Sequence, residues 1–155
     1  MNFQLSALAE TTFKDLFSLS EAVLKEHNIV SELVTEKPGV PCRISLEDAE
    51  IGERVLLINY RHLPDVSPFQ ASHAIYIREH VKQASPQKNQ IPEMITDRII
   101  SLRAFDQQHM MINAELAQGP SIAATITDMF NDEMTDYIHL HFAKPGCYAA
   151  KVNRA

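Results

Sequence analysis

Four short extended segments follow one another in the second half of the chain, and a helical stretch interrupts them only once. They span residues 99–105, 110–116, 137–143 and 148–152. Turn-forming residues separate the members of each pair, at 106–109 and at 144–147. Antiparallel strands can be joined by short turns, whereas parallel strands need a long crossover connection. The order of these segments therefore predicts a mostly antiparallel sheet.

The rest of the chain adds further strands and a few helices. Alternating or continuous apolar residues predict strands at 3–8, 30–35, 42–45, 55–58 and 74–77. The run at 55–58 is apolar throughout, which is typical of a central strand buried on both faces. Helix signals fall at 12–28, 92–98 and 121–130, with Thr12, Ser18 and Ser121 as expected N-caps. We predict an α+β fold in a single domain of residues 1–155, a mostly antiparallel sheet with two or three helices packed on one side.

Composition and charge exclude several classes of protein. The formal net charge of −6 leaves no basic face of the kind that non-specific nucleic-acid binding requires. No apolar segment approaches the roughly 20 residues of a membrane helix, and the N-terminus lacks the features of a signal peptide. Two cysteines, Cys42 and Cys147, are too few for a disulfide framework. We expect a soluble cytoplasmic protein with free thiols that binds neither nucleic acid nor membrane.

The sequence motifs of several enzyme classes are absent. The chain has only four glycines, and they form no phosphate-binding loop. It also has no zinc-protease helix signature, no Gly-x-Ser-x-Gly nucleophile motif and no paired Cys-x-x-Cys. A nucleotide-driven enzyme or a hydrolase with a known linear motif is therefore disfavoured. Whether the protein is an enzyme stays open on the sequence alone.

The segment most suited to chemistry is the predicted strand that contains His139 and His141. Because side chains alternate along a strand, these two imidazoles share one face, and Ile138, Leu140 and Phe142 share the other. Two imidazoles on one face can bind the same metal ion, and zinc is the ion we expect. The sequence thus suggests a domain that binds a divalent metal or another small ligand.

A metal ion needs at least a third ligand, and Cys147 is the nearest candidate in the sequence. If a two-residue turn paired Lys144 with Cys147, however, the thiol would lie on the side of Phe142, away from the histidines. A shift in register would remove this obstacle, because a Pro-Gly turn suits a tight hairpin poorly. Cys42, His73 and His62 remain open as alternative third ligands.

A second hypothesis makes the protein a cysteine-dependent enzyme. Cys42 or Cys147 would act as the nucleophile, with His139 or His141 as its base, and Arg43 could stabilise the thiolate. A third hypothesis is a protein-interaction domain without any site, and a homo-oligomer stays open. Side chains suited to binding a small molecule are Arg43, Asn59, Tyr60, His73 and Arg103.

Several segments of the chain look like one known family. They are residues 36–43, 46–49, 52–57, 101–106, 139–141 and 144–150. Together they resemble the bacterial family catalogued as the domain of unknown function DUF1203. The resemblance covers nearly the whole chain and implies a small, stand-alone bacterial protein. It implies no activity and no catalytic residue, but both cysteine-bearing segments belong to the shared pattern.

Overall fold

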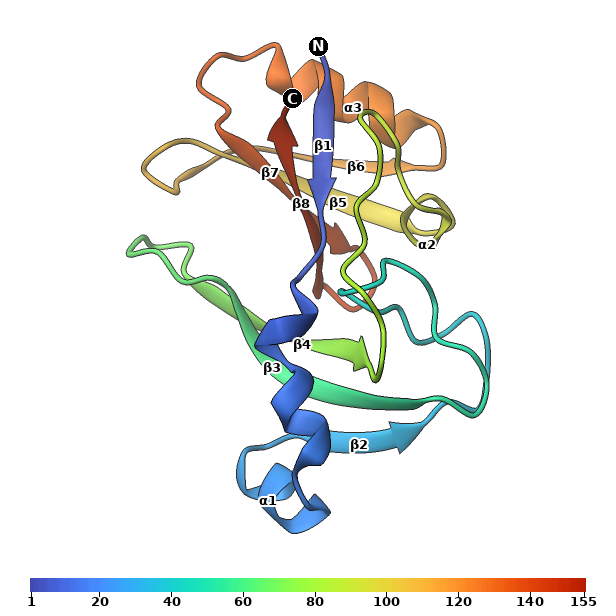
Figure 1. Ribbon diagram of the computed structural model, residues 1–155. Helices are drawn as coiled ribbons and strands as arrows, with labels where there is room; N and C mark the ends of the chain where they lie inside the picture. Colours follow the sequence, from blue (N-terminus) through green and yellow to red (C-terminus); the bar gives the residue numbers. More distant parts are fainter.

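The computed structural model describes residues 1–155 and contains two antiparallel sheets (Figure 1). The larger sheet has five strands in the order β1-β8-β7-β5-β6. Its strands are β1 (Phe3–Ser6), β5 (Ile99–Phe105), β6 (Met111–Gln118), β7 (Tyr137–Phe142) and β8 (Tyr148–Arg154). The smaller sheet has the order β2-β3-β4, with β2 (Val30–Leu33), β3 (Arg54–Leu63) and β4 (Ala71–Arg78). The predicted α+β class and antiparallel pairing are confirmed, and the strands are divided between two sheets.

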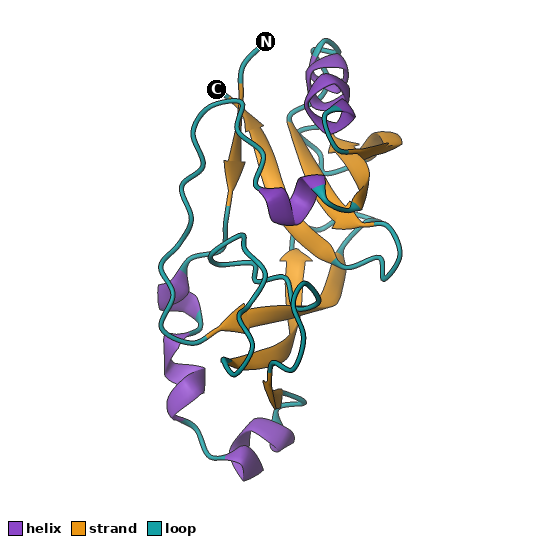
Figure 2. Cartoon of the chain, turned by 90° about the vertical axis from the view of Figure 1, so that its right-hand side faces the viewer, coloured by secondary structure: helices purple, strands orange, loops and turns teal.

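The helices are short and lie at different places around the sheets (Figure 2). Helix α3 (Ser121–Phe130) packs against β5 and β6, α2 (Glu93–Thr96) lies beside β5, and α1 (Glu21–Glu26) contacts β2. Two 3-10 helices, η1 (Glu10–Thr12) and η2 (Lys14–Ser18), precede α1. None of the helices has the length and hydropathy needed to cross a bilayer.

The three predicted N-caps are wrong. Thr12 is the last residue of η1, whose N-cap position is Ala9. Ser18 lies inside η2, where its hydroxyl donates to the Asp15 carbonyl at 2.8 Å, and Ser20 caps α1 instead by accepting from the Val23 N–H. Ser121 is the first residue of α3, and its hydroxyl bonds to the backbone of Gln118. The predicted helix at 12–28 is therefore broken into two 3-10 turns and one short α-helix.

The main core lies between the five-stranded sheet and α3. Side chains that alternate along β5 and β7 point to this side, among them Leu102, Ile138 and Leu140, each fully buried. A second core forms where Leu56, Ile58, Ile75 and Ile77 of the smaller sheet meet the N-terminal helices. The apolar run in β3 is central as predicted, because β3 lies between β2 and β4.

The two sheets meet at the second face of β7. In Figure 1 the three-stranded sheet lies below the larger one, and the ends of β3 and β4 approach β7 and β8. As a result, all six residues of β7 are buried, on both sides of the sheet. The face of β7 that contains His139 and His141 is therefore an internal surface.

The turn between β7 and β8 is longer than the two-residue turn considered from the sequence. The Phe142 N–H donates to the Cys147 carbonyl at 3.0 Å, and the Gly146 N–H donates to the Phe142 carbonyl at 2.8 Å. Gly146 has a φ of +79°, which a glycine adopts without strain. A register shift after Leu140 then places His141 opposite Tyr148.

We predict that Leu140→Ala lowers the free energy of unfolding by about 2–5 kcal/mol, because it leaves a cavity in the main core. The matched control is Leu116→Ala on the edge strand β6. Leu116 is 68% exposed whereas Leu140 is 0% exposed, so the control should change stability by less than about 0.5 kcal/mol. Urea unfolding of both variants checks this, and equal losses would contradict the packing described here.

Candidate metal centre

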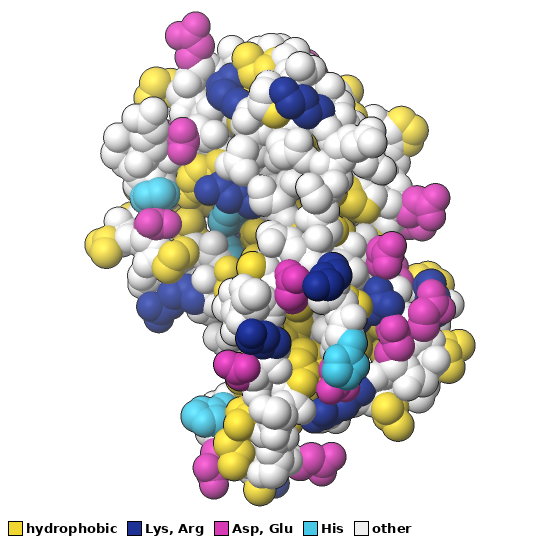
Figure 3. Space-filling model, in the orientation of Figure 1, with side chains coloured by type: hydrophobic (Ala, Val, Ile, Leu, Met, Phe, Trp, Pro, Cys, Tyr) yellow, Lys and Arg dark blue, Asp and Glu magenta, His cyan; other side chains and the backbone are white.

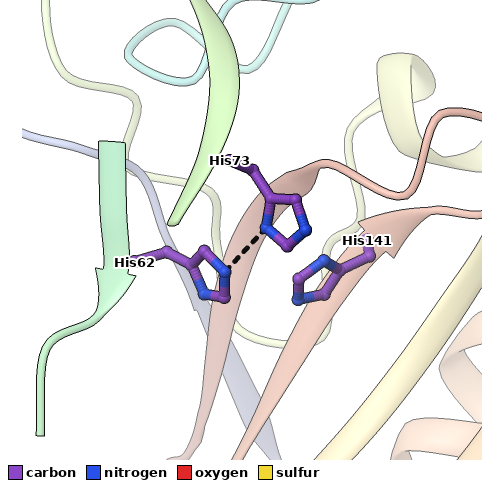
Figure 4. A group of neighbouring side chains, drawn as sticks. All are labelled: His62, His73 and His141. Atoms are coloured by element: carbon purple, nitrogen blue, oxygen red, sulfur yellow. Dashed lines mark hydrogen bonds between the residues drawn. The ribbon is translucent and has the colours of Figure 1, made fainter. Parts of the chain in front are cut away.

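Four histidines from three strands come together where the two sheets meet. His62 lies on β3, His73 on β4, and His139 and His141 on β7. The His62 Nε2 is 2.8 Å from the His73 Nδ1, and the His62 Nδ1 is 3.4 Å from the His139 Nδ1. We refer to these four residues as the histidine cluster. Figure 4 shows three of them, His62, His73 and His141, with their rings turned toward one another.

Local backbone geometry explains how each ring reaches the cluster. On β7, two-residue alternation turns His139 and His141 away from the main core, as predicted. On the smaller sheet, β3 and β4 pair antiparallel with Tyr60 opposite His73. A register shift between Tyr60 and Leu63 follows, and His62 lies within it. The hairpin therefore presents two imidazoles to the two on β7.

His141 has a nitrogen without a hydrogen-bond partner. Its Nδ1 is 3.0 Å from the Gly146 carbonyl oxygen, which only accepts hydrogen bonds, so Nδ1 must be the protonated nitrogen. In the neutral ring this leaves a lone pair on Nε2. That Nε2 is buried and bonds to no atom of the protein. A buried acceptor of this kind is suited to a metal ion.

Three of the imidazoles are close enough to share one ion. A ligand nitrogen from each of His62, His73 and His141 lies within 4.8 Å of the others. Nitrogens bound to one tetrahedral zinc ion at 2.0–2.1 Å are separated by about 3.3 Å. The widest separation therefore exceeds that of a zinc-bound pair by at most about 1.5 Å. His139 is not in this set, although it contacts His62.

Burial keeps the cluster uncharged at neutral pH. Desolvation lowers the pKa of His139 to about 2, of His141 to about 3 and of His62 to about 4. It also lowers the pKa of His73. The positive charge of Arg103 adds to the effect at all four rings. Neutral imidazole is the form that binds metals, so no proton has to leave before an ion binds.

Aromatic rings enclose the cluster. Tyr148 stacks on His62 with a centroid distance of 5.1 Å and an interplanar angle of 9°. Tyr60, a predicted binding residue, lies 6.2 Å from Tyr148 and 5.8 Å from Phe13 between ring centroids. Tyr60 therefore packs between Phe13 and Tyr148, and Tyr148 separates it from His62. These rings limit the access of water to the imidazoles.

Cys147, the third ligand favoured from the sequence, lies outside the three-histidine set. Its only side-chain hydrogen bond is from the Arg43 Nη2 to its Sγ, at 3.0 Å. Arg43 is fully buried and also donates to the carbonyls of Tyr148 and Pro41. No hydrogen bond joins Cys147 to His139 or His141, so the cysteine–histidine pair of the enzyme hypothesis is not formed.

The other residues considered from the sequence have different environments. Cys42 is fully buried, and its Sγ accepts from the backbone N–H groups of Ile44 and Arg78. Asn59 is exposed and takes no part in the hydrogen bonds of the histidine cluster. Arg103 lies on β5 directly opposite His139. The structure thus places His73 in the histidine cluster and Arg103 beside it, and leaves Asn59 and Cys42 away from it. The charge of Arg43 acts on His73, but Arg43 forms no hydrogen bond with the cluster.

The sequence offers His62 and His73 as alternatives to Cys147, and His73 also as a residue that binds a small molecule, but it does not predict that the two lie together. The predicted strands at 55–58 and 74–77 were too short, because β3 continues to Leu63 and β4 begins at Ala71. Had the two strands been extended into one hairpin, both histidines would have fallen on it. The apolar run gave no sign of this extension, because polar residues 59–62 follow it.

A pocket of about 650 Å³ lies next to the cluster. Among its lining residues are His73, Tyr76, Arg98, Phe142 and Cys147. Arg98 is held by both carboxylate oxygens of Asp48, at 2.6 and 2.9 Å. His73 is the one member of the cluster on the pocket wall, so a small molecule in this pocket would approach the cluster at His73.

Outside the pocket, the surface in Figure 3 has basic and acidic side chains interspersed over both parts of the molecule. The face shown has no large patch of one sign. Two positive charges instead lie beside the histidine cluster, because Arg103 and Lys151 are on either side of His139 in the sheet.

We predict that metal-free protein loses at least about 3 kcal/mol of stability between pH 6.5 and pH 5.5. In this range His62, His139 and His141 stay neutral when folded, because their pKa values of about 4, 2 and 3 lie below it. Each takes up a proton on unfolding, so acidification favours the unfolded state by about 1 kcal/mol for each of them. Urea unfolding in the presence of a chelator measures the loss. His141→Asn should remove about 1 kcal/mol of it, and equal stability at the two pH values would contradict burial of neutral rings.

Comparison with known families gives one match. A family model described as "Protein of unknown function (DUF1203)" matches residues 39–154 of the 155-residue chain. The matched region contains both cysteines and all four members of the histidine cluster. No curated protein and no solved structure gives a significant match. The chain therefore belongs to the DUF1203 family, as its resemblance to that family predicted.

Proposed function

We propose that this protein binds a divalent metal ion, best matched by zinc, through His62, His73 and His141. The observation that carries the proposal is the unpartnered Nε2 of His141, buried and directed toward two other imidazoles. Its Nδ1–H bond to a backbone carbonyl is the outer-shell arrangement that orients metal-bound histidines in many zinc sites.

The competing interpretation is a hydrogen-bonded histidine network without an ion. Such a network accounts for the contacts of His62 with His73 and His139, but it leaves the His141 Nε2 without a partner. An unsatisfied buried acceptor costs about 1–3 kcal/mol. A bound ion removes this cost, because it accepts the lone pair of the His141 Nε2.

The donor set favours zinc and leaves room for a further ligand. Three neutral imidazoles suit zinc and its neighbours in the first transition row, and disfavour magnesium or calcium, which prefer oxygen. Three protein ligands with a fourth position open to water or a small molecule is the pattern of catalytic zinc sites. The proposal therefore extends to an exogenous ligand at the metal, and the pocket beside His73 is a route to it.

Zinc titration of protein purified without a histidine tag tests the proposal. We expect one zinc ion per chain, and His141→Ala should weaken its binding by at least about tenfold, because one of three ligands is lost. The matched control is His80→Ala, since the His80 side chain is 89% exposed and lies outside the cluster. Absence of a stoichiometric ion after zinc loading, or equal losses in the two variants, would contradict the proposal.

A second candidate function is thiol chemistry at Cys147. It is favoured by the 3.0 Å contact from the buried guanidinium of Arg43 and by the position of the thiol on the pocket wall. A guanidinium stabilises the thiolate, which is the nucleophilic form of cysteine. Arg43, which the sequence already suggested as a stabiliser of the thiolate, would then be the activating group in place of a histidine.

We expect iodoacetamide to label Cys147 at pH 7 about tenfold faster than it labels free cysteine, which is only a few per cent thiolate at that pH. Mass spectrometry of the Cys42→Ser variant isolates this reaction. The Cys147→Ser variant is the control, because its remaining Cys42 is fully buried and should stay unlabelled. A rate at Cys147 equal to or below that of free cysteine would remove this candidate.

A further inference from the structure

Two cations lie beside the histidine cluster on the same face of the five-stranded sheet. Arg103 of β5 and Lys151 of β8 are both directly opposite His139, one on each side. Residues directly opposite one another in a sheet point to the same face. Both cations therefore share the inner face of β7 with the imidazoles.

Arg103 is unusual among the arginines of this protein. Arg43, Arg54, Arg78, Arg98 and Arg154 are all buried or half-buried, and in each the terminal amino groups donate to a carbonyl, carboxylate, hydroxyl or sulfur. Arg103 is also half-buried, but its only hydrogen bond runs from Nε to the Ser101 hydroxyl at 3.3 Å. Its two terminal amino groups have no partner, and no carboxylate lies within ion-pair distance of it.

Lys151 has no acidic partner either. Its Nζ lies 4.2 Å from the centre of the Tyr137 ring, a cation–π contact, and it forms no salt bridge. The carboxylates that influence this region, those of Asp65, Asp106 and Asp136, act on Tyr137 at the far end of β7. A divalent ion would therefore add two positive charges beside two cations that form no salt bridge with any carboxylate.

The side chains around Arg103 leave its guanidinium open. Ala114 lies opposite Arg103 on β6, and Ser101 lies opposite His141 on β5. Both side chains are small, and the Ser101 hydroxyl fixes the guanidinium through Nε. The terminal amino groups are thus free on the side of the sheet that faces the cluster.

We propose that the exogenous ligand of this metal is a small oxyanion, with one oxygen on the metal and another held by Arg103. The inference rests on the proposed metal site. A partly buried positive site needs an anion to offset the cost of desolvation. The planar guanidinium matches the paired oxygens of a carboxylate or a phosphate, and both share this chemistry.

Cobalt(II)-substituted protein provides the test, because cobalt takes the same nitrogen ligands and its visible spectrum reports changes in coordination. Inorganic phosphate and acetate are titrated separately at constant ionic strength, with perchlorate as the non-coordinating salt. We expect phosphate, acetate or both to change the spectrum with saturation, and perchlorate to leave it unchanged. The anion that binds with the higher affinity shows whether the site prefers a phosphate or a carboxylate.

Arg103→Met should weaken anion binding at least about tenfold, because it removes a charge-assisted hydrogen bond while keeping most of the stem. Its affinity for cobalt itself should stay within a few fold. Arg61→Met is the matched control, since Arg61 is exposed and next to His62, and it should behave as wild type.

The outcomes separate this inference from the metal proposal. If neither zinc nor cobalt binds, the metal site is wrong and the oxyanion inference is lost with it. If cobalt binds and no anion changes its spectrum, or if Arg103→Met binds anions as tightly as wild type, the oxyanion inference alone is overturned.

Discussion

The burial of β7 on both faces is the constraint on which the rest of the structure depends. One face packs its aliphatic side chains against α3, and the other is closed by the ends of β3 and β4. The second face contains imidazoles instead of aliphatic groups, so closing it removes titratable nitrogens from water. Desolvation then holds the rings neutral, and pairing among them engages half of their nitrogens. A site of this kind is costly to build unless something binds there.

The charges around the cluster follow a consistent pattern. The acidic residues that carry the net negative charge pair elsewhere, as Asp48 does with Arg98 and Glu53 with Arg78. None pairs with Arg103 or Lys151, which lie next to the imidazoles. Neutral donors bind the cation while unpaired guanidinium and ammonium groups favour an anion. The same electrostatic environment thus accounts for the proposed metal and for the oxyanion ligand we infer at it.

Local pattern predicted the fold class and half of the cluster. Alternation along residues 137–142 was enough to place His139 and His141 on one face, because the period of a strand is fixed by its backbone. The partners of these residues depended on features that a local pattern does not encode. The division into two sheets brought His62 and His73 across from a distant hairpin. A longer turn and a register shift after Leu140 set the position of Cys147, and the buried Arg43 engaged its thiol.

X-ray absorption at the zinc edge of the loaded protein tests the central claim most directly, because it distinguishes nitrogen from sulfur ligands. We predict a shell of histidine nitrogens at about 2.0–2.1 Å, with three imidazoles per zinc and no sulfur. A sulfur shell at about 2.3 Å would instead place Cys147 on the metal. That result would contradict the three-histidine site.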